Sequence, residues 1–312
     1  MIDIFKISIE QGLICAFAII GVIISFKLLA FPDLTVDGSF TLGGAISSTL
    51  IIHNVSPWIS LIIAILAGSC AGFLTGLLHV KLRISKLLSG ILMLSSLYTI
   101  NLWIMGRSNV SLLDSNTIFK MISNFPGNEY LIKLTLFVTI LFIVWTLLFL
   151  FLKSEIGLFI RATGDNEKFV KSLGISTDMT NLIGLAISNG IVALSGALMA
   201  QNQGFSDVNM GIGTIIWGLA GLIIGESVVK YYYNFRDRFS NTQISMKVDT
   251  IKQILAIGLV GSILYELFIA IILRLGLNPS DIKLATSVII IIALGFGVLE
   301  LNHNSNEKKI KL

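Results

Sequence analysis

The sequence predicts an all-α fold, a polytopic transmembrane helical bundle of about eight to nine membrane segments, of which one is broken or re-entrant. The chain of 312 residues is 54% hydrophobic and only 13% charged, whereas soluble domains carry roughly 25% charged residues. Its apolar residues form runs whose lengths are close to the roughly 20 residues that a helix needs to cross a bilayer. Its basic residues gather in alternate connections between these runs. The formal charge of +4 is small and says nothing about nucleic acid, and no nucleic-acid partner is expected.

Nine apolar segments form a single transmembrane domain over residues 1–301. They lie at 13–30, 38–52, 58–80, 87–105, 131–152, 181–200, 211–228, 251–275 and 282–299. The first has no basic start and no small-residue cleavage site, so we interpret it as a retained helix. The second and seventh are short and glycine-rich, which makes them the candidates for a broken or re-entrant segment. The polar, lysine-rich tail at 302–312 is expected to be disordered.

The basic residues orient these segments. Placing the connection 153–180 in the cytoplasm puts 16 of the 22 lysines and arginines inside, which is the bias that cytoplasmic loops show. The C-terminus is then cytoplasmic. The side of the N-terminus depends on the second segment, because a re-entrant second segment would reverse the first.

Within that connection, residues 157–176 predict a short helix between two membrane segments. Asp165 or Asn166 can cap its start, and Gly174 can adopt the left-handed conformation that ends it. Charged residues match the helix dipole at its two ends, namely Glu167 and Lys171. One side is expected to be apolar, formed by Phe169, Val170 and Leu173. From the residues alone, this stretch is either an ordinary connecting loop or a contact for a partner protein.

A second candidate site opens the second membrane segment at Asp37-Gly-Ser-Phe-Thr41. Broken helices in transporters direct free N–H groups at a substrate, where an amino acid carboxylate fits. Asp37 itself would repel a carboxylate, so it either caps the helix or meets an amino group. The remaining candidates for a polar substrate pathway are Ser39, Thr41, Asn189, Gln201, Gln203 and Asp207. The amides among them either line such a pathway or satisfy backbone groups where the chain turns.

Several motifs, taken in order, resemble one family. Arg161-Ala-Thr-Gly-Asp-Asn-Glu, followed by Leu173-Gly-Ile, resembles the coupling-helix region of ABC permeases of the branched-chain amino acid and ribose type. Phe31-Pro-Asp-Leu-Thr-Val-Asp-Gly-Ser-Phe40 is similar to a motif of an uptake-permease group linked to tryptophan or tyrosine import. Further similar stretches lie at 188–197, 200–213, 258–265 and 277–283. The resemblance covers nearly the whole chain.

The resemblance implies the membrane-spanning permease subunit of a bacterial ABC importer, which translocates a small solute such as an amino acid across the inner (cytoplasmic) membrane. It implies a separate ATPase subunit, an extracellular or periplasmic substrate-binding protein and a homodimer as partners, with no cofactor and no enzyme activity. The sequence has no Gly-x-x-x-x-Gly-Lys-Ser/Thr phosphate loop, so ATP hydrolysis falls to the partner. The implied ATPase-coupling residues are Arg161, Gly164, Asp165, Asn166, Glu167, Lys168, Leu173 and Gly174.

An ion-coupled secondary transporter is the alternative function. It would need ionisable residues at membrane depth, and only Glu266 and Asp37 qualify. Glu266 departs from the family pattern, in which an arginine follows the tyrosine at this position. No metal site is expected, because the three histidines are scattered along the chain. Cys15 and Cys70 lie in apolar runs and are expected to be small buried hydrophobes.

Overall fold

The computed structural model describes residues 2–123, 128–239, 250–276, 284, 286–288 and 291. The ninth predicted segment falls largely outside these residues, and so does the tail at 302–312. The elements are α1 (Ile2–Val22), the π-helix η1 (Ile23–Leu28), α2 (Thr35–Ile52), α3 (Pro57–Val80), α4 (Lys86–Met105), β1 (Asn109–Ser111), α5 (Ile118–Ser123), α6 (Glu129–Lys153), α7 (Glu155–Asp165), α8 (Glu167–Ser172), α9 (Thr177–Gln203), β2 (Phe205–Asp207), α10 (Thr214–Phe239) and α11 (Thr250–Arg274).

The all-α membrane fold predicted from the apolar runs is confirmed. Seven helices of the described residues are long and apolar enough to cross a bilayer. These seven are α1 continued into η1, α3, α4, α6, α9, α10 and α11. The eighth long helix, α2, matches the second predicted segment but is not among the seven. The predicted seventh segment is the first part of the longer helix α10.

The interruption in the helical pattern lies between η1 and α2, at residues 29–34. The chain there is not helical, yet Leu29, Phe31 and Asp33 are fully buried. Irregular backbone at membrane depth is tolerated where protein encloses it. From Thr35 onward α2 is one continuous helix, and Thr49 near its far end donates a hydrogen bond to the Ile104 carbonyl near the end of α4. The second segment therefore continues to the far end of α4 and does not turn back.

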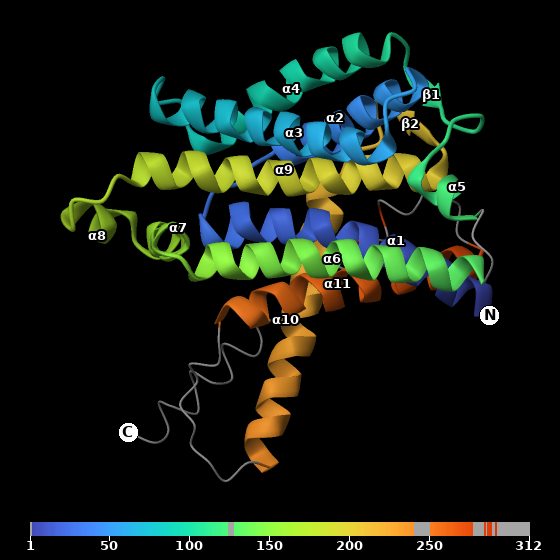
Figure 1. Ribbon diagram of the computed structural model, residues 1–312. Coiled ribbons are helices and arrows are strands. Elements are labelled where there is room, and N and C mark those ends of the chain that lie inside the picture. Colours follow the sequence, from blue (N-terminus) through green and yellow to red (C-terminus); the bar gives the residue numbers. More distant parts are fainter. Residues whose placement is uncertain are drawn as a thin grey trace.

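α9 is the central helix, and it packs against α1, α2 and α3 (Figure 1). Glycines make these contacts close. A Cβ atom on Gly43 of α2 would overlap the Ala193 carbonyl oxygen, and one on Gly72 of α3 would overlap the Leu185 carbonyl oxygen. In the other direction, a Cβ on Gly196 of α9 would overlap the Phe40 carbonyl oxygen. Small residues of this kind let helix backbones approach closely in lipid, where no hydrophobic effect drives association.

The two ends of the bundle differ in structure. At one end β1 pairs antiparallel with β2, with Val110 opposite Ser206, and α5 lies beside them. At the other end α7 and α8 form an elbow between α6 and α9 (Figure 1). The expectation for the cysteines is correct for Cys15, which is buried, and wrong for Cys70, whose position on α3 points away from the bundle.

Candidate functional site

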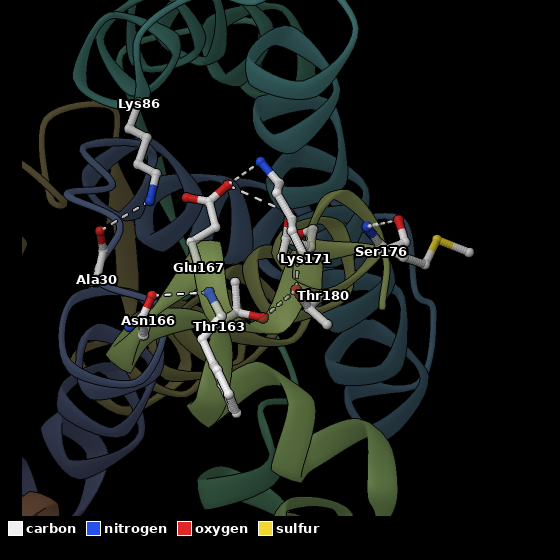
Figure 2. A network of polar contacts seen from close by, with 11 residues as sticks. Ala30, Lys86, Thr163, Asn166, Glu167, Lys171, Ser176 and Thr180 are labelled. Carbon is white, nitrogen blue, oxygen red and sulfur yellow. Dashed lines mark hydrogen bonds and ion pairs between the residues drawn. The ribbon is translucent and has the colours of Figure 1, made fainter. Parts of the chain in front are cut away.

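The elbow formed by α7 and α8 contains the short helix that the sequence predicts. Of the two candidate caps, Asn166 is the one used: its Oδ1 accepts a hydrogen bond of 3.0 Å from the Phe169 N–H (Figure 2). Its extended backbone, with φ at −155°, separates α8 from α7. Gly174 follows α8 with φ at +78°, the left-handed conformation expected of a helix-ending glycine.

Tight contacts hold this elbow against the bundle. A Cβ on Gly164 of α7 would overlap the Leu28 carbonyl oxygen at the end of η1, so no larger residue fits there without a backbone shift. The hydroxyls of Thr163 and Thr180 lie 2.9 Å apart and join α7 to α9. Arg161 donates from Nη2 to the Leu152 carbonyl at 3.2 Å, which ties α7 to the end of α6. The elbow is therefore mounted on three helices.

The prediction that Phe169, Val170 and Leu173 share one side of the short helix is wrong. Val170 is buried, whereas Phe169 and Leu173 are 57% and 59% exposed. Val170 turns toward the bundle, whereas Phe169 and the C-cap residue Leu173, four residues apart, lie on the side away from it. Two apolar side chains thus face away from the protein at the tip of the elbow.

The charges of the elbow are partly paired within the chain. Lys171 Nζ lies 2.8 Å from Glu167 Oε1 (Figure 2). Because Lys171 donates this hydrogen bond, the pKa of the Glu167 carboxyl lies below its ordinary value. The same bond raises the pKa of the Lys171 ammonium group. Asp165 and Lys168 remain exposed.

A buried polar network brings together two of the predicted pathway residues. Ser39 of α2 donates to Asn189 Oδ1 of α9 at 2.7 Å. Asn189 Nδ2 donates to Asp33 Oδ2 at 2.7 Å and to the Leu185 carbonyl at 3.0 Å. Asp33 Oδ1 accepts a bond of 2.9 Å from the Thr35 N–H at the start of α2. All three side chains of the network, those of Asp33, Ser39 and Asn189, are fully buried.

Asp33 was missed by the sequence reasoning, which assigned the polar chemistry of this region to Asp37. The available signal was its position in the interruption, since an acidic residue flanked by apolar side chains at the start of a membrane segment must find a partner. Its partner Asn189 is 156 residues away.

Asp37 caps a helix other than its own. Its two carboxylate oxygens accept hydrogen bonds of 2.9 and 2.8 Å from the N–H groups of Gly213 and Ile215, at the start of α10. Thr41 Oγ1 accepts from the Gly211 N–H at 3.0 Å. Free N–H groups were expected at the start of the second predicted segment. The N–H groups that Asp37 binds lie instead at the start of α10, in the seventh predicted segment. A carboxylate at this position is stabilised by the positive end of the α10 helix dipole.

The three remaining pathway candidates lie near the strand end of the bundle, where Gln201 joins separate helices and Gln203 and Asp207 hold turns. Gln201 accepts from the Ile118 N–H at 3.1 Å and donates to the Ser47 hydroxyl at 3.0 Å. Gln203 donates to the Phe205 carbonyl at 2.8 Å. Asp207 accepts from the Asn209 N–H at 2.8 Å. None of these bonds reaches the Asn189 network.

The acidic residue of the alternative function also has a partner. The Cys15 thiol of α1 donates to Glu266 Oε1 of α11 at 3.4 Å. Lys27 of η1 forms an ion pair with Glu226 of α10. Among the described residues, no group of three or more His, Cys, Asp or Glu side chains is placed to hold a metal ion.

Comparison with known proteins places these features in context. The family described as the permease component of branched-chain amino acid transport systems matches residues 5–295. The tyrosine transport system permease protein of Clostridioides difficile is 41% identical over 96% of this chain and 93% of its own length. An uncharacterised protein of Rickettsia prowazekii is 33% identical over 92% of this chain and 95% of its own. The ribose import permease of Haemophilus influenzae is 24% identical over 67% of this chain and 64% of its own. No solved structure matches.

Proposed function

We propose how this molecule works from one premise: the chain belongs to the permease family of ABC importers. The matching family model is described as the permease component of branched-chain amino acid transport systems. It is a multi-pass membrane permease, and its family implies an ATPase subunit and a substrate-binding protein as partners. The finer proposals are that the elbow of α7 and α8 receives the ATPase, that two copies form a homodimer, and that the solute is an amino acid.

The single observation that supports the ATPase contact is the exposed tip of a firmly mounted elbow. Phe169 and Leu173 lie outward on α8, while Gly164, Thr163 and Arg161 hold α7 against η1, α9 and α6. Two apolar side chains rimmed by Asp165 and Lys168 suit a protein interface, in which apolar anchors supply affinity and rim charges set register. A rigid mount would transmit the movement of the ATPase to the membrane helices.

The proposed orientation puts the elbow, and with it the C-terminus, in the cytoplasm of a bacterium with the permease in its inner membrane. Basic residues support it: Lys81 and Arg83 follow α3, Lys86 begins α4, and Lys153 ends α6, all at the elbow end of the bundle. Cytoplasmic connections carry such an excess. The paired strands β1 and β2 then face the side on which the substrate-binding protein delivers the solute.

The amino acid proposal rests on the relative from Clostridioides difficile, which is named for tyrosine transport, and on buried hydrogen-bond donors and acceptors among the membrane helices. We assign Asp33, Ser39 and Asn189 to the part of the bundle that closes beside the solute. Asp37 and Thr41 hold the start of α10 against α2 and would move with it.

Copurification and uptake test this function. A tagged chain, purified from native membranes in mild detergent, is expected to retain an ATPase that carries a phosphate loop. Phe169→Ala combined with Leu173→Ala should lose that ATPase and abolish uptake, yet leave the amount of inserted permease unchanged, because both side chains are exposed. Leu147→Ala, which truncates a leucine 62% exposed on α6, is the matched control.

The outcomes separate the parts of the proposal. If no ATPase copurifies under conditions that preserve other ABC complexes, the permease function is wrong for this chain. If an ATPase copurifies equally with wild type and with the α8 double variant, the permease function stands and the elbow is not the contact. A further variant, Gly164→Pro, is expected to retain membrane insertion but to uncouple transport, because its ring would meet the Leu28 carbonyl.

A further inference from the structure

The outer face of α4 has a composition that lipid does not favour. α4 lies at one edge of the bundle beside α2 and α3 (Figure 1). Four hydroxyl side chains occupy five consecutive positions at its midpoint, and all four are exposed: Ser95, Ser96, Tyr98 and Thr99. Leucine and isoleucine cover the same face toward one end of α4, and Trp103 covers it toward the other. The hydroxyls thus lie at the depth where a spanning helix is farthest from water.

Two of these hydroxyls are satisfied and two are not. Ser95 donates to the Ile91 carbonyl at 3.1 Å and Ser96 to the Leu92 carbonyl at 2.9 Å, each within α4 itself. The Tyr98 and Thr99 hydroxyls make no hydrogen bond to any residue that the structure describes. A tyrosine in a membrane protein usually lies near the headgroups, where its phenol meets water. An unpaired phenol at mid-span therefore needs water or a polar partner.

The neighbouring outer helices show what a lipid-facing surface of this chain looks like. On α3, the exposed side chains from Trp58 to Leu74 are apolar apart from the thiol of Cys70. On α6, the hydroxyls of Thr135, Thr139 and Thr146 each bond to the carbonyl four residues earlier, at 2.7–2.8 Å. Both faces suit lipid, which offers no hydrogen bonds. The middle of α4 does not.

The inner face of α4 fixes where these hydroxyls lie. A Cβ on Gly38 of α2 would approach Leu97 to 2.8 Å, so the two helices are in close contact there. Asn101 Nδ2 donates to the Gly38 carbonyl at 3.2 Å. Gly38 is next to Ser39 of the buried network, so the hydroxyl face of α4 is mounted on the part of α2 that binds Asn189.

We propose that Ser95, Ser96, Tyr98 and Thr99 of α4 line the polar path for the solute, and that the facing wall is the same surface of a second copy of this chain. The inference rests on the proposed function, since it places the path within a pair of permeases. A two-fold axis beside α4 brings identical patches together, so the unpaired hydroxyls of both copies face one water-filled space. Hydroxyl groups donate and accept, which suits a small zwitterionic solute.

Thiol accessibility tests this assignment without measuring transport. In a Cys70→Ala background that retains the buried Cys15, single variants Ser96→Cys and Thr99→Cys are treated with a charged, membrane-impermeant methanethiosulfonate in proteoliposomes. The controls are Leu66→Cys on α3 and Leu147→Cys on α6, which replace leucines that are 64% and 62% exposed. A charged reagent at mid-depth in lipid is disfavoured by about 100-fold. The α4 variants should therefore react about 100-fold faster than the controls.

A bifunctional maleimide that bridges the path should also join two copies of Thr99→Cys, and it should not join two copies of Leu147→Cys. The α4 assignment is overturned if the Ser96→Cys and Thr99→Cys thiols react no faster than the controls. If an ATPase still copurifies and uptake persists in that case, the importer function stands and the α4 path alone is wrong. Absence of the ATPase would instead count against the importer.

A second pair of variants separates loss of the path from loss of folding. Tyr98→Phe and Thr99→Val remove one hydroxyl each with little change in shape. On a lipid-facing surface both would be neutral or stabilising. On the proposed path both should lower uptake at least fivefold while the ATPase still copurifies, and Thr99→Ser should restore it. Uptake at the wild-type rate in both variants would refute the proposal.

Discussion

Asn189→Ala should destabilise the protein by about 2–5 kcal/mol. Asn189 makes one hydrogen bond to a carboxylate and two to neutral groups, with Asp33, Ser39 and Leu185 as partners. A bond to a charged group contributes about 1.5–3 kcal/mol and a neutral one about 1 kcal/mol, which gives the upper end. Hydrogen bonds between helices in a bilayer average about 0.6 kcal/mol, and three of them give the lower end. The expected loss is large for a single residue.

The assay is reversible unfolding of the purified protein in mixed micelles of mild detergent and dodecyl sulfate. Asn181→Ala is the matched control: it removes a buried asparagine from the same helix, but one whose Oδ1 has no hydrogen-bond partner among the described residues. Its loss of stability should be clearly smaller. A free energy of unfolding for Asn189→Ala within about 0.5 kcal/mol of wild type would refute the account, since that is the size of an ordinary surface change.

An exchange of partners tests the chemistry of the network directly. Asn189→Asp alone sets two carboxylates against each other, which costs more than the loss of a neutral bond. Adding Asp33→Asn restores a donor facing an acceptor, and Ser39 can still donate to the new carboxylate. The double variant should recover most of the stability that Asn189→Asp loses, apart from the bond to Leu185. No recovery would show that the carboxylate and the amide do not interact as described.

Three further predictions follow from single contacts. Asn166→Ala should cost about 1 kcal/mol through loss of the α8 cap and should increase proteolysis at the elbow in membrane vesicles. Gly196→Ala should lower the unfolding midpoint by the equivalent of about 1–3 kcal/mol, because the added methyl meets backbone, and Gly174→Ala, which meets no neighbour, tests strain alone. The pairing of Glu167 with Lys171 stabilises fully above the ordinary pKa of a glutamate. This contribution is below about 0.5 kcal/mol for an exposed pair. Because the pKa of Glu167 is lowered, the contribution disappears as the pH falls through that lowered pKa. Glu167→Gln should remove this pH dependence of the free energy of unfolding.

Local patterns in the sequence predicted the parts of the fold that depend on neighbouring residues. Apolar runs located the membrane helices, because length and hydropathy suffice for a spanning helix. The cap at Asn166 and the left-handed Gly174 depend on φ and ψ preferences that a few residues carry. The elbow was therefore predicted closely, apart from the direction in which Val170 points.

Contacts between distant segments were beyond such patterns. Asp37 was expected either to cap its own helix or to meet an amino group, and it instead caps α10, 176 residues later in the chain. Asp33 was passed over because nothing near it in sequence offers a side-chain partner except Thr35. The pathway candidates were selected for polarity alone, and only packing separates Asn189, which binds Asp33, from Gln201, which joins α9 to α5 and α2, and from Gln203, which holds a turn. One sequence without its tertiary contacts does not carry that distinction.

The polar contacts of α2 with later helices have a consequence for how the protein is made. α2 is the one long helix of the described residues outside the seven candidate spanning helices, and Asp33 and Asp37 lie at its start. During synthesis it leaves the ribosome well before α9 and α10, which later supply Asn189 and the N–H groups that bind Asp37. Until then its polar groups need water or the insertion machinery. Membrane integration of α2 is thus completed after translation of α10, and truncation before residue 215 should leave it unstably inserted.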